Sequence, residues 1–298
     1  MIHWWQERVV YQIYPRSFQD SNGDGIGDIP GIISRLDDLA DLGIGVLWLS
    51  PVYPSPNADN GYDISDYCGI HPDFGTMADM EALIDAAGRR NMKIIMDLVI
   101  NHTSDEHPWF QAARNPDSPY HDWYIWRPGK GRKPGTAADM PNNWTGFFGG
   151  RCWTFDETAQ AYYLHLFGHK QPDLNWRNPA VTAAVEQVLR FWLDKGIAGF
   201  RCDVINLLWK ASLGDGRRKL ILTGSEHYLT REGTHEILRT LRREVLDQYT
   251  CFTVGETVFV TPEQGRDLCL PERRELNLIF PFEHMETDQW IVKWFKRR

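Results

Sequence analysis

Residues 199–206 read Gly199-Phe-Arg-Cys-Asp203-Val-Ile-Asn206, and they decide the fold of this chain. A second apolar run about fifty residues later ends in Gly255-Glu256-Thr257. Both runs have the length and apolar character of buried strands. In parallel α/β proteins the residues at the carboxyl ends of strands line the functional site. Asp203 and Glu256 are therefore predicted to meet at one edge of a parallel sheet.

The alternation of apolar strands and helical segments continues on both sides of this stretch. We expect strands at residues 9–15, 46–50, 93–100, 199–204, 251–256 and 276–282, and helices at 32–42, 77–90, 179–195, 232–248 and from 290 onwards. Repeated βα units with near-continuous apolar strands imply a parallel sheet covered on both faces. A closed TIM-type barrel has eight such units and only about six are visible, so we predict an incomplete (β/α)8 barrel and a truncated chain.

One long segment interrupts this rhythm after the third strand. More than seventy residues, from Thr103 to Trp176, are rich in Pro, Gly, Asn and Trp. A structureless loop of that length is uncommon in a compact domain. We therefore predict a catalytic barrel formed by residues 1–102 and 177–298, with an inserted subdomain at 103–176.

The composition of the chain excludes some classes of binding partner. The net charge of −8 argues against nucleic acid, which needs a concentrated basic surface. No apolar run approaches the length of a membrane span, and the N-terminus lacks the pattern of a secretory signal. The five cysteines are scattered, which fits reduced thiols. We expect a cytoplasmic, monomeric enzyme with a small-molecule partner and neither nucleic acid nor membrane.

Two carboxyl groups at neighbouring strand ends suit the hydrolysis of a glycosidic bond, which uses one ionised and one protonated carboxyl. Arg201 and Asp203 are two residues apart on a strand, so their side chains share a face and the guanidinium is expected to keep Asp203 ionised. Largely apolar surroundings are expected to raise the pKa of Glu256. For either residue alone, an ordinary structural role is the more frequent explanation. Their coincidence at successive strand ends favours catalysis.

Four segments in register resemble the α-amylase family of glycoside hydrolases. They are Asp97-Leu-Val-Ile-Asn-His102, Gln171-Pro-Asp-Leu-Asn-Trp176, Gly199-Phe-Arg-Cys-Asp203-Val-Ile-Asn206 and Gly255-Glu256. The resemblance implies that Asp203 is the nucleophile and Glu256 the proton donor of a retaining mechanism. The family's third carboxylate, which follows a His after strand seven, has no counterpart here, and this puts activity in doubt.

The same resemblance implies a set of substrate-binding residues. His102 and Arg201 would contact the glucose of the first subsite, and Asp59 and Tyr62 would close its end. Gln171 belongs to the same expected set. Two further residues of the inserted subdomain either stack on sugar or belong to its core; they are Phe147 and Phe167.

Two details point to the substrate. The segment Gln12–Asp20 resembles the exo-acting α-glucosidases, and Val204-Ile-Asn206 resembles members that cut α-1,6 links, whereas those that cut α-1,4 links tend to carry Ala in place of Val. We therefore expect an oligo-1,6-glucosidase or dextran glucosidase type of enzyme. The alternatives are a trehalose-6-phosphate hydrolase, an α-1,4-glucosidase, a sucrose isomerase, an inactive fragment or a non-catalytic relative.

A calcium loop is predicted near the N-terminus. Oxygen ligands alternate with a glycine at the sixth position, and the expected ligands are Asp20, Asn22, Asp24, Asp28 and the carbonyl of Ile26. The loop departs from an EF-hand because Gly31 stands at position twelve and because it follows a strand. The alternative is a turn with solvated acids. The same loop in the α-glucosidases it resembles favours structural Ca²⁺.

Overall fold

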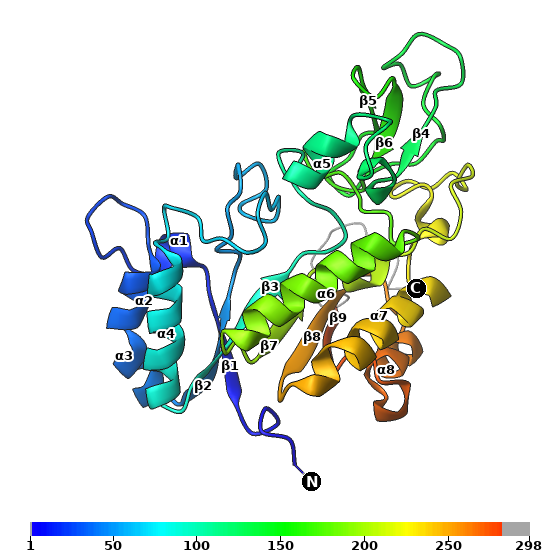
Figure 1. The fold of residues 1–298 in the computed structure, drawn as a ribbon. Coiled ribbons are helices and arrows are strands. Elements are labelled where there is room, and N and C mark those ends of the chain that lie inside the picture. The colour runs from blue at the N-terminus through cyan, green and yellow to red at the C-terminus, as the bar shows by residue number, and fades with distance from the viewer. Residues whose placement is uncertain (1, 282–298) are drawn as a thin grey trace.

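A curved sheet of six parallel strands forms the body of the molecule, as a computed structural model that describes residues 2–281 shows (Figure 1). The strand order along the sheet is β1-β2-β3-β7-β8-β9. The strands are β1 (Val9–Ile13), β2 (Ile44–Leu49), β3 (Lys93–Leu98), β7 (Gly199–Cys202), β8 (Phe252–Thr257) and β9 (Leu278–Pro281). This half-barrel confirms the predicted fold class, and each of these strands overlaps a predicted one, although β2 begins two residues earlier and β8 ends one residue later than expected.

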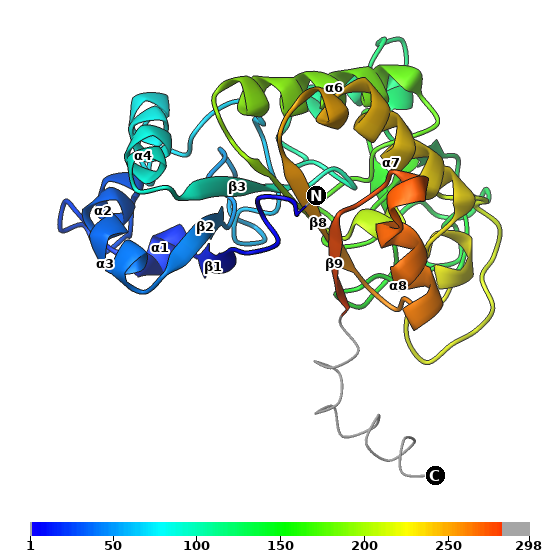
Figure 2. The same ribbon diagram turned by 90° about the horizontal axis from the view of Figure 1, so that it is seen from below.

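Helices cover the outer side of the curved sheet, and the view from below shows the strands as an open arc with β1 and β9 at its two edges (Figure 2). The helices are α1 (Pro15–Phe18), α2 (Ile29–Ser34), α3 (Leu36–Asp41), α4 (Met77–Arg89), α6 (Pro179–Asp194), α7 (Glu232–Glu244) and α8 (Pro262–Cys269). Helices α1 and α8 were not predicted. The helix expected from residue 290 lies outside the described residues.

Local sequence signals explain where these helices begin. Thr76 and Asp79 form a capping box at the start of α4, in which each side chain accepts from the other's backbone N–H. Pro179 occupies the first turn of α6, and its N-cap Asn178 accepts from the N–H of Ala180. The buried face of α6 repeats at helical spacing, as expected, and comprises Val181, Val185, Val188, Leu189, Trp192 and Leu193.

The single helix predicted at 32–42 was wrong, because the structure has two short helices there. The first begins earlier, since Asp28 caps it by accepting from the N–H of Gly31. Arg35 leaves the helical region at φ −107° and ψ 5°. This break lets both helices bury their apolar side chains, among them Ile32 and Leu36.

The segment at 103–176 forms structure of its own beyond the carboxyl ends of the strands (Figure 1). It contains the helix α5 (Pro108–Ala113) and an antiparallel sheet of order β4-β6-β5. The strands of that sheet are β4 (Trp126–Arg127), β5 (Trp153–Asp156) and β6 (Ala161–Leu164). The segment therefore overhangs the edge of the main sheet where Asp203 and Glu256 lie.

Close approach between β7 and β8 depends on Gly199. Its φ is +148°, and a Cβ added there would lie 1.9 Å from the carbonyl oxygen of Phe252. Only glycine tolerates this contact, which fixes the register that places the end of β7 beside that of β8. No helix in the described part of the chain is long and apolar enough to cross a membrane.

Candidate active site

One guanidinium group joins three carboxyl groups at the carboxyl ends of β3, β7 and β8. Arg201 Nη1 lies 2.5 Å from Asp97 Oδ1 and 2.7 Å from Asp203 Oδ1. Arg201 Nη2 lies 2.6 Å from Glu256 Oε2. The register explains the meeting, because Arg201 is paired with Asp97 across β3 and β7, and Glu256 lies near the end of the next strand. The two acids predicted from sequence therefore face the same cation.

Burial sets the protonation of this cluster. Asp97 is completely buried, and Asp203 and Arg201 are each 6% exposed. Burial raises the pKa of Asp97 to about 6, although Arg201 and Trp48 act against it. Burial, together with repulsion from Glu256, raises the pKa of Asp203 well above its ordinary value. Arg201 lowers the pKa of Asp203, as expected, but desolvation outweighs the guanidinium and the net shift is upward. The ionised state of Asp203 stays a prediction.

Glu256 lies in polar surroundings, contrary to the expectation of apolar ones. In addition to Arg201, its Oε2 accepts a hydrogen bond of 3.1 Å from the backbone N–H of Val204. Val204 has φ +36° and ψ +42°, a left-handed conformation that is strained for a β-branched residue. The chain therefore makes a sharp turn immediately after Asp203. This turn places the backbone N–H of Val204 next to the carboxylate of Glu256.

His102 forms one wall of the site together with residues far away in sequence. Its Nε2 lies 3.2 Å from the carbonyl oxygen of Tyr62 and 3.1 Å from the amide nitrogen of Gln171, so the tautomer of the ring decides which of these contacts is a hydrogen bond. Burial lowers the pKa of His102 to about 4, so the ring is neutral at neutral pH. Gln171 contacts His102 and donates from its amide to Asp59 Oδ2 at 2.8 Å. Burial raises the pKa of Asp59.

Aromatic rings line the same cluster. The Tyr62 ring centre is 5.6 Å from the Arg201 guanidinium carbon. Phe167 lies 5.2 Å from the His102 ring and stacks on Phe147 at 4.8 Å between centres. Both phenylalanines are partly buried against an apolar cluster that the inserted segment forms together with Val204, Leu207 and Tyr228. The structure therefore brings all the predicted catalytic and substrate-binding residues into one connected group, and their roles stay predictions.

Sequence reasoning left several members of this group unassigned. Asp97 begins one of the family segments but was given no role, and Trp48, whose Nε1 donates to Asp97 Oδ2 at 2.9 Å, was missed. Lys210 was also missed. It is buried, with its Nζ 2.6 Å from Asp173 Oδ2 and 2.8 Å from Asn101 Oδ1. The position of Asp97 opposite Arg201 was a usable signal, whereas the loop around Lys210 carries no pattern.

The predicted calcium loop is held by its own backbone. Asp20 accepts from the N–H groups of Asn22, Gly23 and Gly25, and these bonds lower its pKa. Asp28 is buried and, besides capping α2, accepts from the Ser21 hydroxyl at 2.7 Å. Among the described residues, no group of three or more His, Cys, Asp or Glu side chains is placed to hold a metal ion. The hard oxygen donors suit Ca²⁺, but a site would depend on Asn22 and on the Ile26 carbonyl, so calcium stays a prediction.

Comparison with known proteins identifies the family. Residues 12–294 match the family described as alpha amylase, catalytic domain. The chain is 56% identical over 290 residues to an oligo-1,6-glucosidase of Parageobacillus thermoglucosidasius, covering 96% of this chain and 50% of the relative. It is 46% identical over 292 residues to a trehalose-6-phosphate hydrolase of Bacillus subtilis, with 96% and 50% covered.

Solved structures agree. The trehalose-6-phosphate hydrolase of Bacillus licheniformis superposes with a TM-score of 0.93 at 44% identity, covering 98% of this chain and 52% of that one. An isomaltulose synthase from Klebsiella superposes with a TM-score of 0.91 at 44% identity, with 96% and 51% covered. The chain spans about half the length of these relatives. By sequence and by fold, the chain belongs to the α-amylase catalytic-domain family.

Proposed function

We propose that this chain carries the catalytic half-barrel of an exo-acting, retaining α-glucosidase that hydrolyses α-1,6 links of isomalto-oligosaccharides. The observation that carries the proposal is the attachment of Asp203 and Glu256 to one guanidinium, within 2.7 Å of its nitrogens. A retaining mechanism needs two carboxyl groups roughly 5 Å apart on opposite sides of the scissile bond.

In this mechanism an Asp203 oxygen attacks the anomeric carbon while the glycosidic C–O bond breaks. Glu256 gives its proton to the departing oxygen, so that a glucosyl ester on Asp203 forms and the leaving alcohol is neutral. Water then attacks the same carbon, Glu256 takes a proton from it, and Asp203 leaves as carboxylate. Two inversions at one carbon retain the α configuration.

The net charge of the cluster supports a mechanism in which one of its carboxyl groups is protonated. Three carboxylates around one guanidinium would carry a net charge of −2 in a buried site, which is costly. The raised pKa values of Asp97 and Asp203 express that cost. We propose that the cluster holds one proton near neutral pH and that substrate binding places it on Glu256.

Support for α-1,6 links comes from the relatives named oligo-1,6-glucosidase and from Val204, whose buried side chain follows the proposed nucleophile. A second candidate is hydrolysis of trehalose 6-phosphate, because enzymes of that name match over almost the whole chain. An α-1,4-glucosidase or a sucrose isomerase is less well supported. We further propose oligosaccharide as the partner, a monomer in the cytoplasm, and 103–176 as a subdomain that closes the site.

The test is turnover of isomaltose, maltose, sucrose and trehalose 6-phosphate by the purified chain. Asp203→Asn and Glu256→Gln should each lower kcat/KM at least about a thousandfold. Asp117→Asn, which changes an exposed aspartate of the inserted segment, is the matched control and should leave it unchanged. Activity that survives Asp203→Asn, or a chain that neither turns over nor binds isomaltose, would contradict the proposal.

A further inference from the structure

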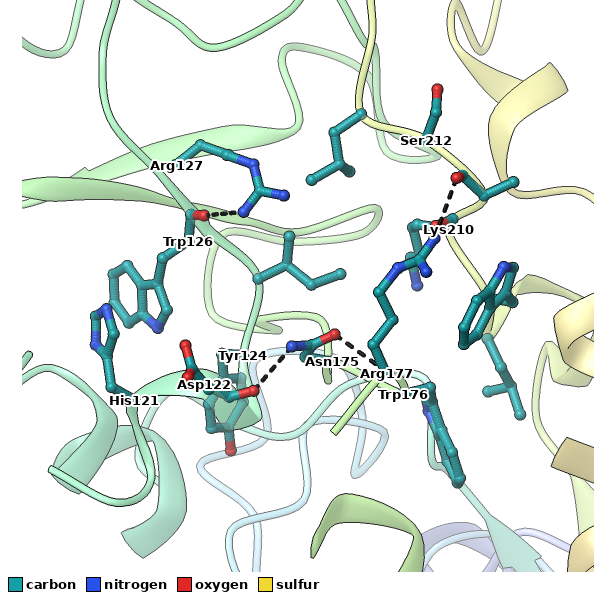
Figure 3. A pocket seen from close by; sticks show the side chains of 15 residues that line it. His121, Asp122, Tyr124, Trp126, Arg127, Asn175, Trp176, Arg177, Lys210 and Ser212 are labelled. Carbon is teal, nitrogen blue, oxygen red and sulfur yellow. Dashed lines mark hydrogen bonds between the residues drawn. The ribbon is translucent and has the colours of Figure 1, made fainter. Parts of the chain in front are cut away.

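A cavity of about 400 Å³ lies outside the carboxylate cluster. Its walls come from three parts of the chain: β4 with the turn before it, residues 175–177, and the loop that follows β7 (Figure 3). Charged and polar side chains occur on all three walls, including Asp122, Arg127, Arg177 and Ser212. No residue of the proposed glucose subsite lines it.

Two arginines enter this cavity from different walls. Arg127 Nη1 donates to the carbonyl oxygen of its neighbour Trp126 at 2.7 Å. Arg177 Nη2 donates to the carbonyl oxygens of Lys210 and Ala211 at 2.9 and 3.1 Å, and its guanidinium carbon lies 4.1 Å from the centre of the Trp209 ring. Within residues 2–281 neither guanidinium has a carboxylate partner, so each keeps N–H donors for a ligand.

The charge balance of the cavity is positive. Asp122 is the one carboxylate among the lining residues of the described chain. The third cation of the lining, Lys210, is already neutralised, because its Nζ lies 2.6 Å from Asp173 Oδ2. Two unpaired guanidinium groups against one carboxylate favour an anion, and planar guanidinium forks match oxyanions.

We propose that this cavity binds a phosphate-bearing small molecule, with the phosphate between Arg127 and Arg177. The cavity is larger than a phosphate ion, and its apolar and aromatic lining leaves room for an organic group; that lining includes Tyr124, Ile125, Leu208 and Trp209. A phosphate monoester with a sugar-sized body therefore fits better than the free ion.

The cavity shares a wall with the candidate active site. Lys210 lines the cavity, yet its Nζ donates to Asn101 Oδ1, and the Asn101 amide lies 3.3 Å from His102 Nδ1. Trp176 likewise lines the cavity and donates from Nε1 to the Ile100 carbonyl at 2.9 Å. A ligand in this cavity would contact Lys210 and Trp176, which hydrogen-bond the segment that positions His102, without entering the glucose subsite.

Calorimetric titration of the full chain with inorganic phosphate tests the proposal, at constant ionic strength set with NaCl because exposed charges are screened by salt. We expect saturable binding. Arg127→Gln should weaken it about 10- to 100-fold, the loss expected for a charge-assisted hydrogen bond. Arg127 is the informative variant, since among residues 2–281 its guanidinium hydrogen-bonds only to the neighbouring Trp126 carbonyl, whereas Arg177 also holds the loop after β7 in place.

Two further variants test whether the charge of the cavity controls phosphate affinity. Asp122→Asn removes the opposing charge and should tighten binding a few-fold. Arg132→Gln changes another exposed arginine of the same subdomain, outside the cavity, and should leave binding unchanged. The proposal is overturned by absence of binding, or by equal affinity in wild type and Arg127→Gln.

A second titration separates free phosphate from a phosphate monoester, using glucose 6-phosphate, phosphate and glucose. Tighter binding of glucose 6-phosphate than of phosphate, lost in Arg127→Gln, supports the monoester. Equal affinity of the two anions limits the site to phosphate, and binding of glucose alone with the same affinity overturns the assignment. These are binding measurements, so their outcome is independent of the proposed hydrolysis.

Discussion

The carboxylates at the strand ends and those of the loop at 20–28 behave in opposite ways. Asp97 and Asp203 are buried around a single guanidinium, and their pKa values are raised. Asp20 is only partly buried, accepts several backbone N–H groups, and its pKa is lowered. The pKa of an aspartate side chain therefore depends on how many hydrogen-bond donors contact it and on how far burial removes it from water. Acids in sequence motifs cannot be read as equivalent.

The largest test of this contrast is removal of the cation from the buried cluster. Arg201→Gln leaves Asp97, Asp203 and Glu256 without a counter-charge and should lower the free energy of unfolding by about 3–5 kcal/mol. Arg35→Gln breaks an exposed pair with Asp38 and should cost less than about 1 kcal/mol. Urea denaturation measures both. Equal losses would mean that burial does not distinguish the two regions.

The next test is the pH dependence of stability. The pKa of Asp97 is raised from 3.8 to about 6, so the folded chain binds this proton more tightly than the unfolded chain. Its contribution is fully present below about pH 4 and is lost as the pH rises through about 6; two pKa units correspond to roughly 3 kcal/mol. Asp97→Asn should flatten the unfolding free energy between pH 4 and 6. An unchanged slope would contradict the assignment.

The loop at 20–28 supplies the same test with the opposite sign. The lowered pKa of Asp20 contributes stability that is present above its ordinary value and lost as the pH falls below it. Asp20→Asn should therefore reduce the fall in unfolding free energy that occurs when the pH is lowered. Asp97→Asn should instead reduce the fall that occurs when the pH is raised toward 6. Denaturation at pH 3 and at pH 6 separates the two signs, and matching signs would break the comparison.

The smallest expected effect concerns calcium. If the loop binds Ca²⁺, excess chelator should lower Tm by a few degrees and Ca²⁺ should restore it, because a ligand that binds only the folded state stabilises it. Asp24→Asn should weaken that response, and Asp117→Asn should not. If neither chelator nor Ca²⁺ changes the Tm, the chain has no structural calcium site. The acidic residues of the loop then only form the turn.

Most of the strand-end geometry was accessible to sequence reasoning. Arg201 and Asp203 share a face because they are two residues apart in a strand, and Glu256 lies beside them because parallel strands end at one edge. The break at Arg35 escaped prediction, because a continuous apolar period hid two helices that bury their faces separately. Helix α8, which is short, escaped as well.

Covalent spacing and apolar periodicity were enough to predict the order of βα units, the inserted segment and the side chains that gather at the sheet edge. The upward pKa shift of Asp203, the pairing of Lys210 with Asp173, and the cavity lined by Arg127 and Arg177 became visible only in the folded chain. These depend on desolvation and on neighbours tens of residues away along the chain, and no local pattern encodes either.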